Sequence, residues 1–337
     1  MDVVLLAHEK FPDRAKTAVG VLRYADYDVV GVLDRENAGK RVAEFLPDVQ
    51  DAPIFESMAD APDADALVIG IAPIGGGFDD TWRDDVTTAI EDGCDVISGL
   101  HYFLQDDDEF AALADEHGVD LWDVRKPDDD LTVSQGVADQ VDAEVVLTVG
   151  TDCSVGKMTV SYELMRAAQE RGESAAFIPT GQTGIMIEGW GNPIDRVISD
   201  FTAGAVEEMI LEKGDEYDYL FVEGQGSIVH PAYSAVTLGI LHGAMPDKLV
   251  LCHKTGRDAI HGYESFDLPP LADYVDLYED LAAPVHEAEI VAGALNTYDV
   301  ADDEAARAAV EEYAADLGVP ATDPVRFDAD EVLDRLL

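Results

Sequence analysis

Positively charged residues are scarce in this chain. Its 337 residues contain 21 lysines and arginines against 71 aspartates and glutamates, a formal net charge of −50. The cations form no basic patch, so neither nucleic acid nor an anionic membrane is expected as a partner. The acidic residues are spread along the whole chain, and concentrated salt screens their repulsion to within about 3 Å at 1 M. We interpret this charge as an adaptation to a high-salt cytoplasm.

Cysteines and long apolar runs are also few. The three cysteines, Cys94, Cys153 and Cys252, show no C-x-x-C spacing, which predicts neither disulfides nor a zinc site. No charged-then-apolar leader and no run of about 18 apolar residues occurs, so a soluble cytoplasmic protein is expected. Apolar residues make up 47% of a chain long enough for about two domains, each with its own core.

Short apolar runs alternate with helix-like segments through the first part of the chain. The runs are Val3–Ala7, Val29–Leu33, Ala66–Ile71, Val96–Ser98 and Leu121–Val124. Such alternation predicts a parallel sheet with helices on both faces. Asp34 closes the second run, where a dinucleotide-binding domain holds a ribose, but no G-x-G-x-x-G precedes it. A solvated aspartate at a strand end is therefore the preferred interpretation of Asp34.

A glycine-bounded turn lies near the middle of the chain, between the apolar run V-V-L-T-V and the helix-like run S-Y-E-L-M-R-A-A-Q-E. A strand, a turn ending in Gly-Lys and a helix are typical of phosphate-binding loops. In these loops backbone N–H groups, a helix N-terminus and a lysine contact phosphate oxygens. The residues predicted to bind a cofactor are Gly150, Thr151, Asp152, Cys153, Ser154, Val155, Gly156, Lys157, Met158 and Thr159.

Two features of this turn depart from the usual pattern. Five residues, not four, separate Gly150 from Gly156, and Met158 stands where Ser or Thr is usual. Thr159 is then the nearest hydroxyl that could meet Mg²⁺. The five-residue form G-T-D-x-x-V-G-K resembles dethiobiotin synthetase and its cobyrinate-amidating relatives. A tight turn without a ligand is the alternative interpretation.

Polar residues follow three later apolar runs, at the ends of predicted strands. Glu223 follows Asp218–Val222, at the place where a Walker-B carboxylate holds Mg²⁺ or its water. Thr180 and Gln182 follow Ser174–Ile178. The segment after Lys248–Cys252 carries two cations and a histidine that could face phosphates or a substrate carboxylate. The predicted substrate contacts from these segments are Thr180, Gln182, His253, Lys254 and Arg257.

Three further candidates each have a structural alternative. Asp195 lies beside the loop Gly189–Pro193 and either caps the next helix or takes part in catalysis. His230, a few residues beyond Glu223, is a solvated loop histidine or a group for proton transfer. Arg125, after an apolar run in the first half, contacts a substrate carboxylate or forms a structural salt bridge.

Several segments together resemble the DgcN-type family, long a domain of unknown function and now associated with D-glutamate N-acetyltransferase activity. They are G-V-L-R-Y-A, S-G-L-H-Y-F-L, D-V-R-K-P, G-T-D-C-S-V-G-K-M-T, V-E-G-Q-G-S-I-V-H-P-A-Y-S, H-K-T-G-R and A-T-D-P-V-R. The resemblance covers nearly the whole chain. It implies an α/β architecture: a Rossmann-like domain over residues 1–142 and a P-loop NTPase-like domain of the dethiobiotin-synthetase type over residues 143–337.

The resemblance also implies acetyl transfer from acetyl-CoA to the amino group of D-glutamate or a similar small amino acid. The loop could hold the phosphates of coenzyme A without cleaving them. Transfer needs a base for the amine, and His230 or Glu223 is expected in that role, with Asp195 a further catalytic candidate. Covalent transfer through Cys153 is an alternative.

Two other functions stay open on the motifs. An ATP- and Mg²⁺-dependent ligase or kinase acting on a small carboxylic acid would use the loop for ATP and Thr159 and Glu223 for the metal. A nucleotide-binding regulator without turnover would use the loop alone. A homo-oligomer is expected in each case.

Overall fold

The computed structural model describes residues 1–73 and 75–337. The chain divides into two compact units, which are described separately. The first comprises Met1–Pro127 and Gln182–Pro193, and the second comprises Asp128–Gly181 and Ile194–Leu337. Among the helices of the described residues, none is long and apolar enough to cross a lipid bilayer.

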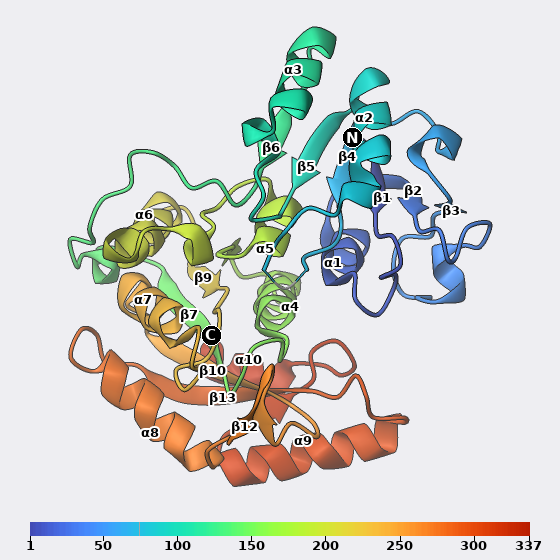
Figure 1. Cartoon of the computed structure of the whole chain (residues 1–337). Helices are drawn as coiled ribbons and strands as arrows, with labels where there is room; N and C mark the ends of the chain where they lie inside the picture. Colours follow the sequence, from blue (N-terminus) through green and yellow to red (C-terminus); the bar gives the residue numbers. More distant parts are fainter. Residues whose placement is uncertain (74) are drawn as a thin grey trace. The chain divides into compact units, whose positions relative to one another are not determined.

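The first unit is built on one six-stranded parallel sheet (Figure 1). Its strands are β1 (Asp2–Leu6), β2 (Asp28–Leu33), β3 (Ile54–Phe55), β4 (Ala66–Ile69), β5 (Asp95–Ser98) and β6 (Leu121–Asp123), in the order β3-β2-β1-β4-β5-β6. Its helices are α1 (Lys16–Tyr24), α2 (Arg83–Glu91), α3 (Asp108–His117) and α5 (Gln182–Glu188). Short 3-10 helices span Val42–Glu44, Met58–Asp60, Asp80–Trp82 and Leu104–Asp106. The predicted parallel sheet is confirmed.

The strands of this sheet are apolar on both faces. All four residues of β4 are buried, as are Val3–Leu6 of β1. Parallel strands covered by helices on both faces read as continuous apolar runs, and this is why the runs were visible in the sequence. Asp34, in contrast, is not solvated as expected. It is fully buried, and its carboxylate accepts hydrogen bonds from Glu9 N at 2.8 Å and Asn37 Nδ2 at 2.7 Å.

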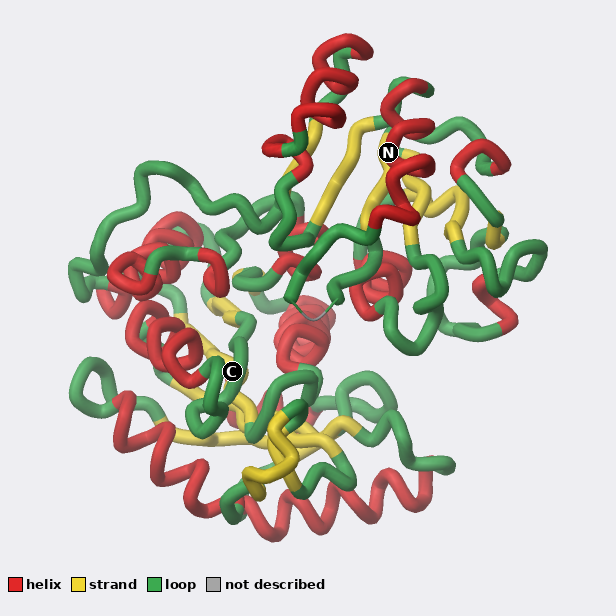
Figure 2. Tube along the Cα trace, in the orientation of Figure 1, coloured by secondary structure: helices red, strands yellow, loops and turns green. Residues whose placement is uncertain are grey.

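The second unit holds a second six-stranded parallel sheet, in the order β14-β13-β10-β7-β9-β8. Its strands are β7 (Glu144–Gly150), β8 (Ala175–Ile178), β9 (Tyr219–Val222), β10 (Lys248–Lys254), β13 (Glu289–Asn296) and β14 (Ala321–Thr322). A separate hairpin pairs β11 (Ala259–Ile260) with β12 (Tyr263–Asp267). Strands alternate with helices along this unit, and Figure 2 shows its strands in yellow and its helices in red.

The helices of the second unit are α4 (Lys157–Glu170), α6 (Thr202–Lys213), α7 (Ser234–Ala244), α8 (Leu271–Ala282), α9 (Asp303–Leu317) and α10 (Asp330–Leu336). Short 3-10 helices span Ala138–Gln140, Ile194–Arg196 and Ser199–Phe201. One core joins Leu164 of α4 and Leu333 of α10 to Phe177 of β8 and Phe221 of β9. Helices α8 and α9 pack beside β13 (Figure 1). The expected P-loop NTPase-like architecture is confirmed.

The division into units differs from the boundary expected after residue 142. Residues 128–142 group with the second unit and residues 182–193 with the first. In the first unit, α5 is held by the Tyr27 hydroxyl, which donates to the Met186 carbonyl oxygen at 2.9 Å. In the second, residues 134–137 are held by Glu207 of α6. Such contacts join segments far apart in sequence, so no local pattern predicts them.

The Glu207 carboxylate is buried and gathers three donors. It accepts from Gln135 N at 2.6 Å, Val137 N at 2.8 Å and Ser134 Oγ at 2.9 Å. Burial by itself would raise the pKa of Glu207, but the hydrogen bonds outweigh it and the pKa is lowered. Glu207 therefore stabilises the second unit in its charged form.

We expect Glu207→Gln to lower the free energy of unfolding by about 1–3 kcal/mol, because one amide N–H₂ then faces backbone N–H donors. Urea titration measures this. Glu208→Gln, at the exposed neighbouring position of α6, is the matched control and should change little.

The loss of stability in Glu207→Gln should depend on pH. Since the folded pKa of Glu207 lies below the unfolded value, its contribution is present above the unfolded pKa and disappears as the pH falls through the folded pKa. A loss that stays equal at acidic and neutral pH would contradict the role given to this carboxylate.

Candidate functional site

The loop between β7 and α4, here called the P-loop (residues 150–159), has the backbone of a phosphate cradle. Gly156 has φ +105° and Ser154 φ +55°, left-handed conformations that glycine adopts without strain. Val155 is fully buried in the core of the second unit and so fixes the position of the loop. A Cβ at Gly156 would come within 3.4 Å of Asn296 Nδ2, so the loop also abuts the end of β13.

Lys157, the first residue of α4, turns its side chain back over the loop. Its ammonium group is buried and donates to the Asp152 carbonyl oxygen at 2.8 Å. Burial lowers the pKa of Lys157, while Cys153, Cys252, Asp152 and Glu223 act to raise it. A cation held in this position is the one expected to meet a phosphate.

Two buried tyrosines of α8 hold the carbonyl groups of the loop. The Tyr278 hydroxyl donates to the Gly150 carbonyl oxygen at 2.8 Å and accepts from Ile228 N at 3.1 Å. The Tyr274 hydroxyl donates to the Thr151 carbonyl oxygen at 2.7 Å. Burial raises the pKa of Tyr278 to about 12 and also raises that of Tyr274, so both remain donors. No sequence motif marked these residues.

Asp152 ties the loop to the segment after β10. Its Oδ2 accepts from Arg257 Nη1 and from His261 N, each at 2.8 Å, and its Oδ1 accepts from Cys153 N at 2.7 Å. The carboxylate is fully buried, and Arg257 balances its charge. Arg257, predicted to contact substrate, is thus engaged by the loop itself.

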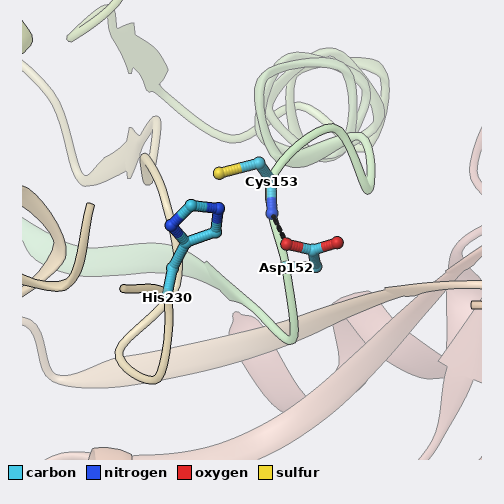
Figure 3. Close-up of side chains that lie close together, drawn as sticks. All are labelled: Asp152, Cys153 and His230. Atoms are coloured by element: carbon cyan, nitrogen blue, oxygen red, sulfur yellow. Dashed lines mark hydrogen bonds between the residues drawn. The ribbon is translucent and has the colours of Figure 1, made fainter. Parts of the chain in front are cut away.

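The ring of His230 is buried beside the loop. His230 Nδ1 accepts from Ala232 N at 3.1 Å, and the ring packs against Tyr233 and Tyr263 with centroids 4.6 and 5.2 Å away. In Figure 3 the imidazole faces the side chains of Cys153 and Asp152. One polar atom from each of these three side chains lies within 4.8 Å of the others, a group that could in principle hold a metal ion.

Glu223 joins the ends of β9 and β8. Its Oε2 accepts from Thr180 N at 3.1 Å and Gly181 N at 3.0 Å, and its carbonyl oxygen accepts from Thr180 Oγ1 at 2.7 Å. The side chain amide of Gln225 donates to the Thr180 carbonyl oxygen. The two predicted residues Glu223 and Thr180 are therefore neighbours, bound to each other at the carboxyl edge of the sheet.

His253 and Lys254 end β10 beside the loop. His253 Nδ1 lies 2.8 Å from Thr151 Oγ1, and its ring stacks on Tyr313. Lys254 forms an ion pair with Asp299 at 2.8 Å. Burial and Arg257 lower the pKa of His253, with Asp152 acting in the opposite direction.

A cavity of about 240 Å³ opens next to the loop. Its wall is formed by Thr151, His253, Arg257, Asp258, Tyr274 and the segment 268–271. The wall is charged on the Arg257–Asp258 side and apolar along the segment 268–271.

The remaining predicted residues lie in other places. Asp195 lies in the 3-10 helix Ile194–Arg196, whose first residue donates from its backbone N–H to the Thr180 carbonyl oxygen at 3.0 Å. Arg125 and Gln182 belong to the first unit. There the buried Arg125 donates from Nε to the Gly99 carbonyl oxygen at 2.7 Å, and Gln182 lies against the same Gly99. Thr159 is in the first turn of α4.

The match to known families agrees with this architecture. A model described as "Domain of unknown function (DUF1611_C) P-loop domain" matches residues 132–333. A second, "Domain of unknown function (DUF1611_N) Rossmann-like domain", matches residues 35–127. The chain belongs to the DUF1611 family. The resemblance noted in the sequence is confirmed, and so are the two domain types it implied.

Proteins that are similar to this chain include named enzymes. The chain is 36% identical over 323 residues to "D-glutamate N-acetyltransferase" of Tritonibacter scottomollicae, covering 96% of this chain and 94% of the relative. It is 36% identical over 274 residues to a protein of the same name from Pseudoalteromonas sp, covering 81% of each. A crystal structure of a DUF1611 family protein from Anabaena variabilis ATCC 29413 superposes with a TM-score of 0.94 at 40% identity, covering 99% and 98% of the two chains.

We expect Tyr278→Phe to weaken the binding of ADP or acetyl-CoA. The variant leaves the Gly150 carbonyl oxygen and Ile228 N without their shared partner, so the loop loses a fixed conformation. Calorimetric titration should show at least a severalfold loss of affinity.

Tyr313→Phe is the matched control. Tyr313 is also a buried tyrosine that donates to a backbone carbonyl oxygen, that of Leu251 at 2.9 Å, but it does not hold the P-loop. Both variants should unfold at lower urea concentration, and only Tyr278→Phe should bind less tightly. Equal affinities in the two variants would show that the tyrosine merely supports the fold.

Proposed function

We propose that this chain transfers an acetyl group from acetyl-CoA to the amino group of D-glutamate or a similar small amino acid, with the P-loop holding cofactor phosphates. One observation carries the proposal: a phosphate cradle with Lys157 turned onto it, in a chain that aligns over 96% of its length with a D-glutamate N-acetyltransferase. Coenzyme A carries a pyrophosphate and a 3′-phosphate, which suit such a loop.

The loop and the reacting carbonyl are separated in this arrangement. The pantetheine arm between the pyrophosphate and the thioester is about as long as four extended residues, roughly 14 Å. With the phosphates on the P-loop, side chains that touch the loop act on phosphate, and the acceptor amine meets the thioester farther away. If the loop binds the phosphates of coenzyme A without cleaving them, no carboxylate is needed there to activate water.

The carboxylates of the acceptor need cations, and the two predicted cations of the second unit, Lys254 and Arg257, differ in their partners. Arg257 is paired with the buried Asp152, so releasing it would leave a buried charge unpaired. Lys254 is paired with Asp299, whose side chain is 61% exposed. Exchanging Asp299 for a substrate carboxylate costs little because water solvates the released aspartate. Lys254 is therefore the better candidate for contact with the acceptor.

An ATP-dependent ligase or kinase is the second candidate, and Glu223 is the observation that favours it. Glu223 follows β9, the neighbour of β7, where a Walker-B carboxylate stands in P-loop enzymes, and Thr159 lies in the first turn of α4. Together these two residues could hold Mg²⁺ beside the phosphates.

Product analysis by mass spectrometry distinguishes the two candidates. The purified chain is incubated with acetyl-CoA, or with ATP and Mg²⁺, and with a panel of D- and L-amino acids. We expect N-acetyl-D-glutamate together with release of the coenzyme A thiol. Release of ADP or phosphate that depends on the acid would instead support ATP chemistry.

We expect Lys157→Ala to reduce the affinity for acetyl-CoA by about 10–100-fold, since it removes a charged hydrogen bond worth about 1.5–3 kcal/mol. Calorimetric titration measures the affinity, and circular dichroism confirms that the variant is folded. Lys213→Ala, which removes an equal charge from the end of α6, is the control and should bind normally. Unchanged affinity in Lys157→Ala would count against the phosphate site.

A further inference from the structure

The hydrogen bond from Ala232 N to His230 Nδ1 decides which proton the ring carries. A backbone N–H can only donate, so Nδ1 must be the acceptor, and the proton of the neutral ring resides on Nε2. A second proton could enter only at Nδ1, against the N–H of Ala232. Burial also lowers the pKa of His230, which keeps the ring neutral.

The Nε2–H group is a buried donor without a matching acceptor. The residue is 1% exposed, and within the described part of the chain no atom accepts a hydrogen bond from Nε2. The backbone of His261 lies near enough to the ring to raise its pKa, but it does not meet the distance and angle of a hydrogen bond to Nε2. The carboxylate of Asp152 accepts from Cys153 N, Arg257 Nη1 and His261 N, but not from Nε2. A buried donor left unsatisfied costs about 1–3 kcal/mol, and a ligand acceptor would recover this.

The edge of the His230 ring that carries Nε2 is turned toward the P-loop. Cys153 and Asp152 lie on that side (Figure 3), and the ammonium of Lys157 is near enough to lower the pKa of the ring. A hydrogen-bond acceptor bound between the P-loop and His230 would meet the Lys157 ammonium group and the neutral Nε2–H donor together. Phosphate oxygens are acceptors of this kind.

Other roles of the same group fit less well. A base or a metal ligand at Nε2 needs a lone pair on that nitrogen. In the neutral ring the lone pair is on Nδ1, which accepts from Ala232 N, and Nε2 carries the proton. The nearby cations Lys157 and Arg257 also oppose a divalent ion. A Cys153 thiol cannot pass its proton to His230, since the nitrogen that could receive it faces away from the loop.

We propose that His230 is a neutral hydrogen-bond donor to the cofactor phosphates, through Nε2–H, and not the base of the reaction. This inference rests on the proposed phosphate site of the P-loop, but not on the identity of the acyl acceptor. It replaces the expectation that His230 removes a proton from the amine. The extended length of the pantetheine arm, roughly 14 Å, is a second reason, because with the arm extended a group at the loop does not reach the amine.

Two variants of similar size separate the possible roles. In His230→Gln the side-chain amide nitrogen lies as many bonds from Cα as Nε2 does, so it can donate to phosphate but cannot act as a base. In His230→Asn the amide oxygen can still accept from Ala232 N, but no donor reaches the loop. His230→Ala removes both functions.

The test is calorimetric titration of each variant in the full-length chain with acetyl-CoA, ADP and inorganic pyrophosphate. We expect His230→Gln to bind within a fewfold of the parent chain, and His230→Asn and His230→Ala to bind about tenfold more weakly. Turnover at saturating acetyl-CoA should persist in His230→Gln. Urea unfolding of each variant shows whether it is folded, and the Gln–Asn comparison remains valid if Ala is not.

Several outcomes would overturn this role. Equal affinity in the Gln and Asn variants would show that no donor is needed, and loss of turnover with normal affinity in His230→Gln would indicate a base. Binding by the parent chain that requires Zn²⁺ would indicate a metal ligand. An acetyl group on Cys153 after incubation with acetyl-CoA alone would indicate covalent transfer. Failure of the parent chain to bind any of the three probes would overturn it together with the phosphate site. If the parent chain binds pyrophosphate but acetylates no amino acid, the proposed reaction fails and the role of His230 is still tested.

Discussion

The conformation of the P-loop depends on hydrogen bonds to its own carbonyl groups. Three successive carbonyl oxygens are held: that of Gly150 by Tyr278, that of Thr151 by Tyr274 and Ser227, and that of Asp152 by Lys157. When carbonyl groups are fixed on one side of a turn, the intervening N–H groups are directed to the other, where an anion can bind. The conformation of the loop is therefore fixed by its own Lys157 and by residues outside it, two of them on α8, before any ligand arrives.

Charge at the site contrasts with charge in the whole chain. The protein has a formal net charge of −50, yet Lys157, Arg257 and Lys254 are grouped around one sheet edge. Asp152 balances Arg257, so the buried region contains no large excess of either sign. An anionic cofactor would be repelled at long range in dilute buffer, and concentrated salt confines that repulsion to a few ångströms. Binding then depends on the local cations and donors.

His230 and His253, two of the histidines near the loop, show how a neighbouring hydrogen bond determines which ring nitrogen can donate. His230 receives a backbone N–H at Nδ1, which forces its proton to Nε2. His253 meets a threonine hydroxyl at Nδ1, and a hydroxyl can either donate or accept. Residue type alone suggested proton transfer for His230. The backbone group beside the ring indicates a donor instead.

Much of the fold and part of the site could be predicted from the sequence. The strands of both sheets appear as apolar runs because both faces of a parallel sheet are buried, and the P-loop is recognisable because its glycines, lysine and helix start are contiguous. Glu223 lies directly after β9, and this strand end could be predicted because the residues before Glu223 form an apolar run.

Only the tertiary structure could show what holds these parts. Tyr274 and Tyr278 are more than a hundred residues from the carbonyl groups they bind, and on α8 they look like ordinary core residues. The grouping of residues 182–193 with the first unit and the ion pair between Arg257 and Asp152 also depend on contacts between distant segments. The tautomer of His230 depends on the loop conformation that brings Ala232 N to Nδ1. Local sequence determines which backbone shapes are available. Hydrogen bonds across the fold decide which polar groups remain for a ligand.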